Sequence, residues 1–205
     1  RSGRKAGAGR GGMKAFLDFE ASSLEKGGFP VEVGWVLEDG AEEAHLIRPA
    51  PDWTVWSEEA EAIHRLSRAR LEAEGEAPGA VATRMMEALA GHEILASAPS
   101  WDGQWLSRLL RAAGLPRHAL RLGDTDAAEE AEADRILREA GLAAAKRAEQ
   151  VRRIVAEARQ ADEALGPPEH RALADARRAH RLFEAVRQAA RAGAEQHRAA
   201  ATAQG

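Results

Sequence analysis

The spacing of apolar and polar residues predicts strands at the start of the chain and mostly helices after them. Residues 14–19, 31–37 and 44–47 are short apolar runs bounded by polar turns, which is typical of strands. These three runs favour an antiparallel meander. A further apolar run at 93–98 is typical of a buried strand, and a short strand is expected at 120–122. Strands mixed with helices in this order indicate an α/β domain.

Helical spacing dominates the second part of the chain. Helical segments are expected from residue 57, over 81–90, 101–113 and 126–165, and from about 171 to about 192. Gly141 is expected to interrupt the longest of these segments. Pro167 and Pro168 are expected to end it, because proline neither continues a helix nor allows the residue before it to be helical.

These patterns predict one ordered domain over residues 13–192, in which 126–165 is a helical insert. Residues 1–12 are basic and Gly-rich, so we expect a disordered tail or a remnant of cloning, with Met13 as the natural start. Residues 193–205 have no apolar stripe and are expected to fray. The apolar residues of the insert lie at helical spacing, so the insert forms either an extra core layer or the surface of a homodimer.

Composition narrows the class of protein. The 205 residues are 44% hydrophobic and 30% charged, as in soluble globular domains, and no apolar run is long enough to cross a bilayer. The chain has no cysteine, which excludes disulfides and Cys-ligated zinc and fits a cytoplasmic protein without a membrane partner. Its net charge of −4 is unlike that of proteins that coat nucleic acid, but an enzyme gripping a few terminal nucleotides need not be basic.

Two acids stand at the end of the first predicted strand. Asp18 and Glu20 are two residues apart, so on a strand their side chains point to the same face, while Phe19 points into the opposite layer. Two carboxylates at this spacing can share a divalent cation. The alternative is a strand end with two solvated acids.

Three further residues carry candidate chemistry. Asp102 stands where the strand at 93–98 gives way to a helix, a position at which Asp is commonly a helix cap. His170 and Asp175 are too far round a helix to converge if both are helical. The two prolines before His170 allow it to lie outside the helix and fold back toward Asp175. The alternative is a surface His and an ion-paired Asp among arginines.

Taken together, these residues resemble the DEDD exonuclease superfamily, in the branch that uses histidine. The motifs are Asp18-Phe19-Glu20, Trp101-Asp102 and the run from His170 to Asp175, and Glu32-Val33-Gly34 and residues 63–67 resemble supporting segments. The chain has no tyrosine, so the branch that uses tyrosine in place of the histidine is closed. The resemblance covers about residues 13–187. It implies a ribonuclease H-like fold, a mixed five-stranded sheet with an antiparallel meander followed by parallel strands and flanked by helices.

The resemblance also implies a reaction, a 3′→5′ exonuclease releasing nucleoside 5′-monophosphates from single-stranded DNA or RNA ends. Its cofactors are two Mg²⁺ or Mn²⁺ ions, with Asp18 bridging both, Glu20 and Asp175 completing one site and Asp102 supporting the other. His170 is the general base, a role that suits a group titrating near neutral pH. The alternatives are a catalytically silent nucleic-acid-binding module and a phosphodiesterase acting on very short oligonucleotides.

Substrate contacts are expected near the first motif. The resemblance places Phe19, Ala21, Ser22, Leu24 and His64 at the terminal nucleotide, with Leu24 wedged against its base. His64 is alternatively a residue of a packed corner. Ala21-Ser22-Ser23 departs from the Thr-Thr-Gly usual in the family, so the choice between DNA and RNA stays open. Trp53 and Trp56 stack on bases or pack in the core, and the arginines of the last helix guide phosphates or form a solvated face.

Overall fold

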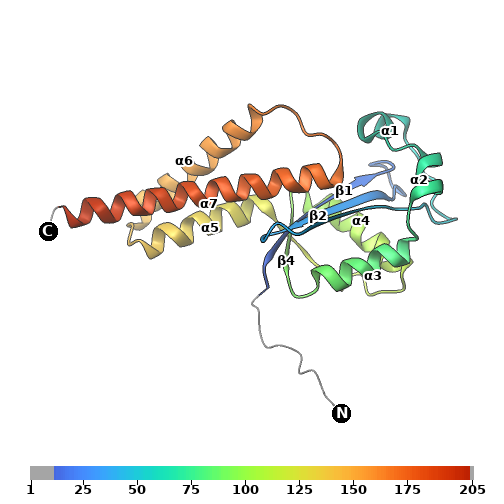
Figure 1. The fold of residues 1–205 in the computed structure, drawn as a ribbon, viewed down its shortest axis with the longest axis horizontal. Helices are drawn as coiled ribbons and strands as arrows, with labels where there is room; N and C mark the ends of the chain where they lie inside the picture. Colours follow the sequence, from blue (N-terminus) through green and yellow to red (C-terminus); the bar gives the residue numbers. More distant parts are fainter. Residues whose placement is uncertain (1–11, 204–205) are drawn as a thin grey trace, which may run out of the picture.

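A computed structural model describes residues 12–203 as a mixed five-stranded sheet with helices on both faces (Figure 1). The strands are β1 (Lys14–Ala21), β2 (Pro30–Leu37), β3 (Glu42–Leu46), β4 (Glu93–Ala96) and β5 (Leu122–Asp124). The first three form an antiparallel meander, β4 runs parallel to β1, and β5 runs parallel to β4, giving the order β3-β2-β1-β4-β5. The predicted sheet is confirmed.

Helices cover the two faces unequally. They are α1 (Glu58–His64), α2 (Arg68–Glu74), α3 (Pro78–Leu89), α4 (Pro99–Ala112), α5 (Thr125–Glu139), α6 (Ala144–Glu163) and α7 (Ala172–Thr202). On one face α3 and α4 pack into the main core; on the other α5 and α7 lie on the strands and α6 packs against both (Figure 1). Within the described chain, no helix has the length and apolar character needed to span a bilayer.

Side chains of β1 alternate between these two layers, as a strand requires. Leu17 and Phe19 are buried in the core beneath α3 and α4. Phe16 faces α7 and packs against Phe183, with ring centroids 5.2 Å apart. Asp18 and Glu20 are on the same face as Phe16, two and four residues further along the strand. The strand is therefore apolar where it crosses the core and acidic where it ends under the start of α7.

Gly34 lets α7 approach the sheet closely. It is the cross-strand partner of Asp18, and a Cβ built on it would collide with the backbone of Ala172 and Leu173 at the start of α7. Only glycine offers this space, because every other residue carries a Cβ there. The first turn of α7 consequently lies directly over the end of β1.

The helical insert adds a second core. Gly141, at a φ of 86°, separates α5 from α6 as predicted. Apolar residues of α5 and α6 pack against α7 in one cluster: Ala133, Ile136, Leu137, Val151, Ile154, Val155, Val186, Ala190 and Ala194. The insert thus buries its apolar stripe within the chain, as the first of the two alternatives expected.

The helix boundaries differ from the prediction at the C-terminal end. Fraying from residue 193 was expected, but α7 continues to Thr202. Ala194 is fully buried, and Gly193 lies against the side chains of Gln150 and Leu137. The prediction was wrong because small residues carry no apolar signal, although they allow α6 and α5 to approach α7 closely. Residues 1–11, which were expected to be disordered, are outside the described chain together with 204–205.

Candidate active site

The carboxylates of Asp18 and Glu20, at the end of β1, are partly buried. Three further carboxylates lie near them, those of Glu32, Asp102 and Asp175. Burial raises the pKa of Asp18 well above its usual range, and the negative charges of Asp102 and Glu20 raise it further. Burial likewise raises the pKa of Glu20 to about 8, with a further contribution from Asp175. A shift of this sign means that the ionised carboxylates are poorly solvated and repel one another.

Asp102 comes from the first turn of α4. Its side chain is 3% exposed, and burial raises its pKa to about 7, although the backbone N–H groups of Ala98 and Phe19 oppose this increase. The alternative role as a helix cap does not hold, because the cap position of α4 is Ala98. Instead, Oδ2 of Asp102 is buried without any hydrogen-bond partner in the described chain. Such an atom is costly unless something else binds it.

His170 and Asp175 approach from the start of α7. His170 has a φ of 54°, in the left-handed region, so the chain turns sharply after Pro168 before the helix begins at Ala172. The backbone N–H of Glu169 donates to Oδ1 of Asp175 over 3.2 Å, which folds this turn onto the helix. His170 is therefore outside the helix, while Asp175 lies in its first turn.

These segments bring a compact set of ligand atoms together. Glu20, His170 and Asp175 each offer one atom, and the three atoms lie within 4.8 Å of one another. Asp18 and Asp102 add two carboxylates that interact electrostatically with this group. Oxygen-rich sites of this kind suit Mg²⁺ or Mn²⁺, and a divalent cation relieves the repulsion that raises the pKa values. The unpartnered Oδ2 of Asp102 is a further point in favour of the fit.

Glu32 on β2 fastens the turn that carries His170. Its carboxylate is 3% exposed and accepts hydrogen bonds from Nη2 and Nε of Arg171, at 2.6 and 3.0 Å. It also accepts the backbone N–H of Ala172 at 3.0 Å. One buried carboxylate therefore holds both the residue after His170 and the first residue of α7 against the sheet.

A cavity of about 360 Å³ opens beside Asp18, His170 and Asp175. It is also lined by Thr125 and Glu129 of α5, two residues that the sequence analysis missed. Glu129 is fully buried and pairs with Arg159 at 3.1 Å, and its Oε1 has no hydrogen-bond partner among residues 12–203. Burial raises its pKa to about 7. The signal was a glutamate on the helix face that otherwise carries Ala133, Ile136 and Leu137.

The predicted substrate contacts differ in accessibility. Leu24 is 67% exposed and Ala21 is half-buried. The side chains of two other predicted contacts have partners within the fold. Phe19 is buried in the core, since it faces away from Asp18. The hydroxyl of Ser22 donates to the carbonyl of Val55 and accepts the N–H of Phe29, so it holds the turn after β1.

His64 and the tryptophans mainly build structure. His64 is 2% exposed, its Nδ1 accepts the N–H of Leu66 at 3.0 Å, and burial lowers its pKa. This supports the packed-corner alternative, although Nε2 is buried without a partner in the described chain. Trp53 is buried and stacks on Phe29, with ring centroids 5.3 Å apart, which supports the alternative that it packs in the core. Trp56 is half-buried beside His64.

The class that this architecture defines is the ribonuclease H-like fold, with a mixed five-stranded sheet in the order described and helices on both faces. Three structures of Escherichia coli exonuclease I share it with this chain at 18% sequence identity. The metal-free complex with single-stranded DNA has a TM-score of 0.50 and covers 62% of this chain and 31% of its own. The corresponding values are 0.50, 65% and 32% for the zinc-bound complex with single-stranded DNA. They are 0.50, 62% and 30% for the complex with a dA16 oligonucleotide.

These comparisons are structural. The chain spans about a third of the length of the solved structures that it matches. At 18% identity the likeness shows a shared fold. No protein-family model matches the sequence, and no curated protein matches it either.

Proposed function

We propose that this chain is a metal-dependent 3′→5′ exonuclease that releases nucleoside 5′-monophosphates from single-stranded DNA or RNA ends. The observation that carries the proposal is the meeting of Asp18, Glu20, Asp102, His170 and Asp175, which come from three separate segments. A structural role does not account for this set, because the repulsion among its carboxylates destabilises the fold rather than supporting it. The likeness in fold to exonuclease I, solved with single-stranded DNA, agrees with this chemistry.

The carboxylates of Asp18, Glu20, Asp102 and Asp175 are the proposed ligands of Mg²⁺ or Mn²⁺. When bound, these ions lower the pKa of water and stabilise charge on the attacking and leaving oxygens. His170 is exposed at the edge of the cluster, where a ring nitrogen can accept the proton of the attacking water. The P–O3′ bond then breaks, which leaves a nucleoside 5′-monophosphate and a strand shortened by one residue with a free 3′-hydroxyl.

The test uses the full chain with Mn²⁺ or Mg²⁺ and oligonucleotides labelled at the 5′ or the 3′ end. A 3′→5′ exonuclease produces a ladder of shortened products from the 5′-labelled strand. From the 3′-labelled strand it releases the labelled terminal mononucleotide first. Asp18→Asn is expected to abolish release. Asp39→Asn is the matched control, because Asp39 lies in an exposed turn and asparagine keeps the oxygen that accepts the N–H of Ala41.

The alternatives have their own outcomes in this assay. Hydrolysis of dinucleotides without any shortening of longer strands indicates a phosphodiesterase on very short oligonucleotides. Binding of single strands without release, together with a melting temperature that Mn²⁺ does not change, indicates a catalytically silent module. Either result contradicts the proposed exonuclease.

A further inference from the structure

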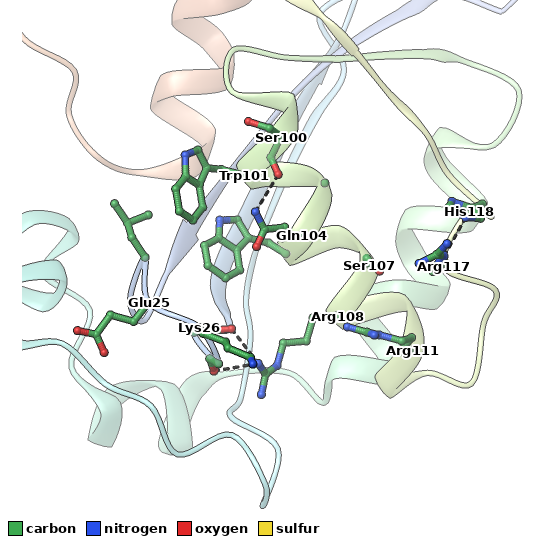
Figure 2. A pocket seen from close by; sticks show the side chains of 15 residues that line it. Glu25, Lys26, Ser100, Trp101, Gln104, Ser107, Arg108, Arg111, Arg117 and His118 are labelled. Atoms are coloured by element: carbon green, nitrogen blue, oxygen red, sulfur yellow. Dashed lines mark hydrogen bonds between the residues drawn. The ribbon is translucent and has the colours of Figure 1, made fainter.

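A second, larger cleft runs along α4. It has a volume of about 640 Å³ and is lined by residues 24–28 after β1, by one face of α4 and by Arg117 and His118 after α4. Figure 2 shows Trp101 at one part of the cleft and Arg108 and Arg111 further along α4. Trp101 directly precedes Asp102 in the chain, so the lining of the cleft and the carboxylate cluster share the first turn of α4.

The cleft is positively charged. Its lining contains Lys26, Arg108, Arg111 and Arg117 against the single acid Glu25. Across residues 12–203, none of these four cations forms an ion pair with a carboxylate. Within the described residues, direct ion pairs consequently do not neutralise the positive charge of the cleft, although the whole chain carries a net charge of −4.

Three arginines of α7 behave differently. Arg177 pairs with Glu42, Arg178 pairs with Asp162 at 2.7 Å, and Arg187 pairs with three acids, Glu38, Glu132 and Glu184. These guanidinium groups are neutralised within the fold. A role for the α7 arginines in guiding phosphates was one of two expected alternatives, and these three arginines are not free for it. Arg181 and Arg191 form no ion pair within residues 12–203, but they do not line the cleft beside α4.

Arg108 gives the cleft a fixed wall. Its Nη1 donates to the carbonyls of Gly27 and Gly28 at 2.8 and 3.0 Å, and its guanidinium lies over the ring of Trp53, 5.4 Å from the centroid. Burial lowers the pKa of Arg108, in keeping with a structural position. Lys26, Arg111 and Arg117 are exposed, so they are the cations left for a ligand.

An aromatic surface lies at the same cleft. Trp101 is 41% exposed, and its ring stacks on the buried Trp105 with centroids 6.2 Å apart and an angle of 22° between planes. The support of Trp105 keeps the outer face of Trp101 in one orientation. Leu24, the most exposed apolar residue of the cleft, lines it as well. A rigid exposed aromatic face next to unpaired cations is the arrangement by which proteins bind single strands, with bases stacked and phosphates paired.

We propose that this cleft binds the single-stranded segment on the 5′ side of the scissile phosphate. A base stacks on Trp101, and Lys26, Arg111 and Arg117 contact phosphates further along. The inference rests on the proposed function, because it assumes that the 3′ end occupies the carboxylate cluster. Arg111 is nine residues beyond Asp102, or about 14 Å along a helix. A dinucleotide held at the carboxylates therefore does not need these cations, whereas a longer strand uses them.

The experiment separates strand binding from hydrolysis. Binding of fluorescein-labelled dT12 and rU12 is measured by anisotropy in EDTA, across a salt titration. The triple variant Lys26→Glu/Arg111→Glu/Arg117→Glu is compared with the parent chain and with Lys146→Glu/Arg152→Glu/Arg191→Glu. This control reverses the same charge at exposed positions of α6 and α7. Hydrolysis of the dinucleotide dTpdT is measured in parallel, and thermal melting verifies that all variants fold.

The cleft variant is expected to bind dT12 at least about tenfold more weakly than the control variant. For this variant, the slope of log K against log salt concentration should decrease in magnitude by about 2. Each phosphate contact to a single strand contributes about 0.7, and the variant removes three cations. Hydrolysis of dTpdT should stay within about twofold of the parent chain. Trp101→Ala should weaken binding by about tenfold without a change in slope, because it removes stacking and no charge.

Equal binding and equal slope for the cleft and control variants would overturn the proposal, as would absence of measurable binding by the parent chain. Comparison of dT12 with rU12 identifies whether the cleft binds DNA or RNA. Weaker binding of either oligonucleotide by the cleft variant supports the proposal. Failure of the proposed function gives a different result. In that case the parent chain releases no mononucleotide from dT12 in Mn²⁺, whatever it does to dTpdT, while the binding comparison in EDTA still decides the role of the cleft.

Discussion

The guanidinium of Arg171 pairs with the buried carboxylate of Glu32, at 2.6 and 3.0 Å, and so joins β2 to the residue that follows His170. The pair spans 139 positions of the sequence. Arg171 is half-exposed, but Glu32 is not, so Glu32 depends on this partner and on the N–H of Ala172 for its hydrogen bonds. Because the turn before α7 is fixed here, the pair positions the backbone at His170.

Arg171→Leu is expected to lower the free energy of unfolding by about 1–3 kcal/mol, because it leaves a buried carboxylate without its charged partner. It should also reduce nuclease activity by displacing His170. Urea denaturation and the rate of mononucleotide release measure the two effects. Arg171→Lys should restore part of both. The control is Arg177→Leu, which removes a more exposed ion pair and should lower the free energy of unfolding less than Arg171→Leu does. Equal stability of the two leucine variants would contradict the positioning role.

Gly34→Ala is expected to destabilise the fold by about 1–3 kcal/mol, because the added Cβ collides with backbone atoms of Ala172 and Leu173. The start of α7 must then move away from β1, and binding of Mn²⁺ should weaken with it. Gly79→Ala in α3 is the matched control, since its Cβ would meet nothing closer than 3.9 Å. Thermal melting with and without Mn²⁺ measures both effects. A Gly34→Ala protein that matches the control in both would show that α7 does not need this close approach.

Without metal, the protein should lose stability as pH rises through the neutral range. The folded-state pKa values of Glu20 and Asp102 are raised to about 8 and about 7, whereas the unfolded chain ionises these groups near pH 4. The folded state therefore binds more protons between about pH 4 and pH 8. Each such proton lowers stability by about 1.4 kcal/mol per pH unit where the folded group is protonated and the unfolded group is not.

Melting temperatures in EDTA and in Mn²⁺ across this range measure the effect. The stabilisation by Mn²⁺ should grow with pH, because the ion competes with protons for the carboxylates. The double variant Glu20→Gln/Asp102→Asn should show a flatter pH dependence in EDTA. The raised pKa values would be contradicted if, between about pH 5.5 and 8 in EDTA, the melting temperature of the parent chain rose with pH relative to that of the double variant.

His170→Asn is expected to reduce mononucleotide release by about 10²–10⁴-fold, the usual loss when a general base is removed. Asparagine is the informative replacement, because it tolerates the left-handed backbone at this position, where φ is 54°. The fold and the stabilisation by Mn²⁺ should change little, since His170 is exposed and the carboxylates remain. Rates near those of the parent chain, with the fold intact, would remove His170 from the proposed mechanism.

Much of this architecture was predictable from residue spacing. The alternation in β1 assigns Phe19 and Asp18 to opposite layers without any knowledge of other segments, because strand geometry is local. The two prolines before His170 likewise predict its place outside the helix. Helix boundaries were less predictable where the packed residues are small, as at Ala194. The role of Glu129 was also missed, because its burial depends on α6 and α7 rather than on its neighbours in the chain.

By itself, the sequence determined the order of the elements and the chemistry of each separate motif, since both depend on local backbone geometry and residue type. Only the tertiary structure decided which polar groups are enclosed together. Three features involve residues far apart in the chain. They are the close approach of α7 to Gly34, the pairing of Glu32 with Arg171 and the burial of Asp102. The same holds for charge, since arginines of α7 and of the cleft look alike in sequence. Their neighbours in space decide which are neutralised, because ion pairing depends on distance and exclusion of water.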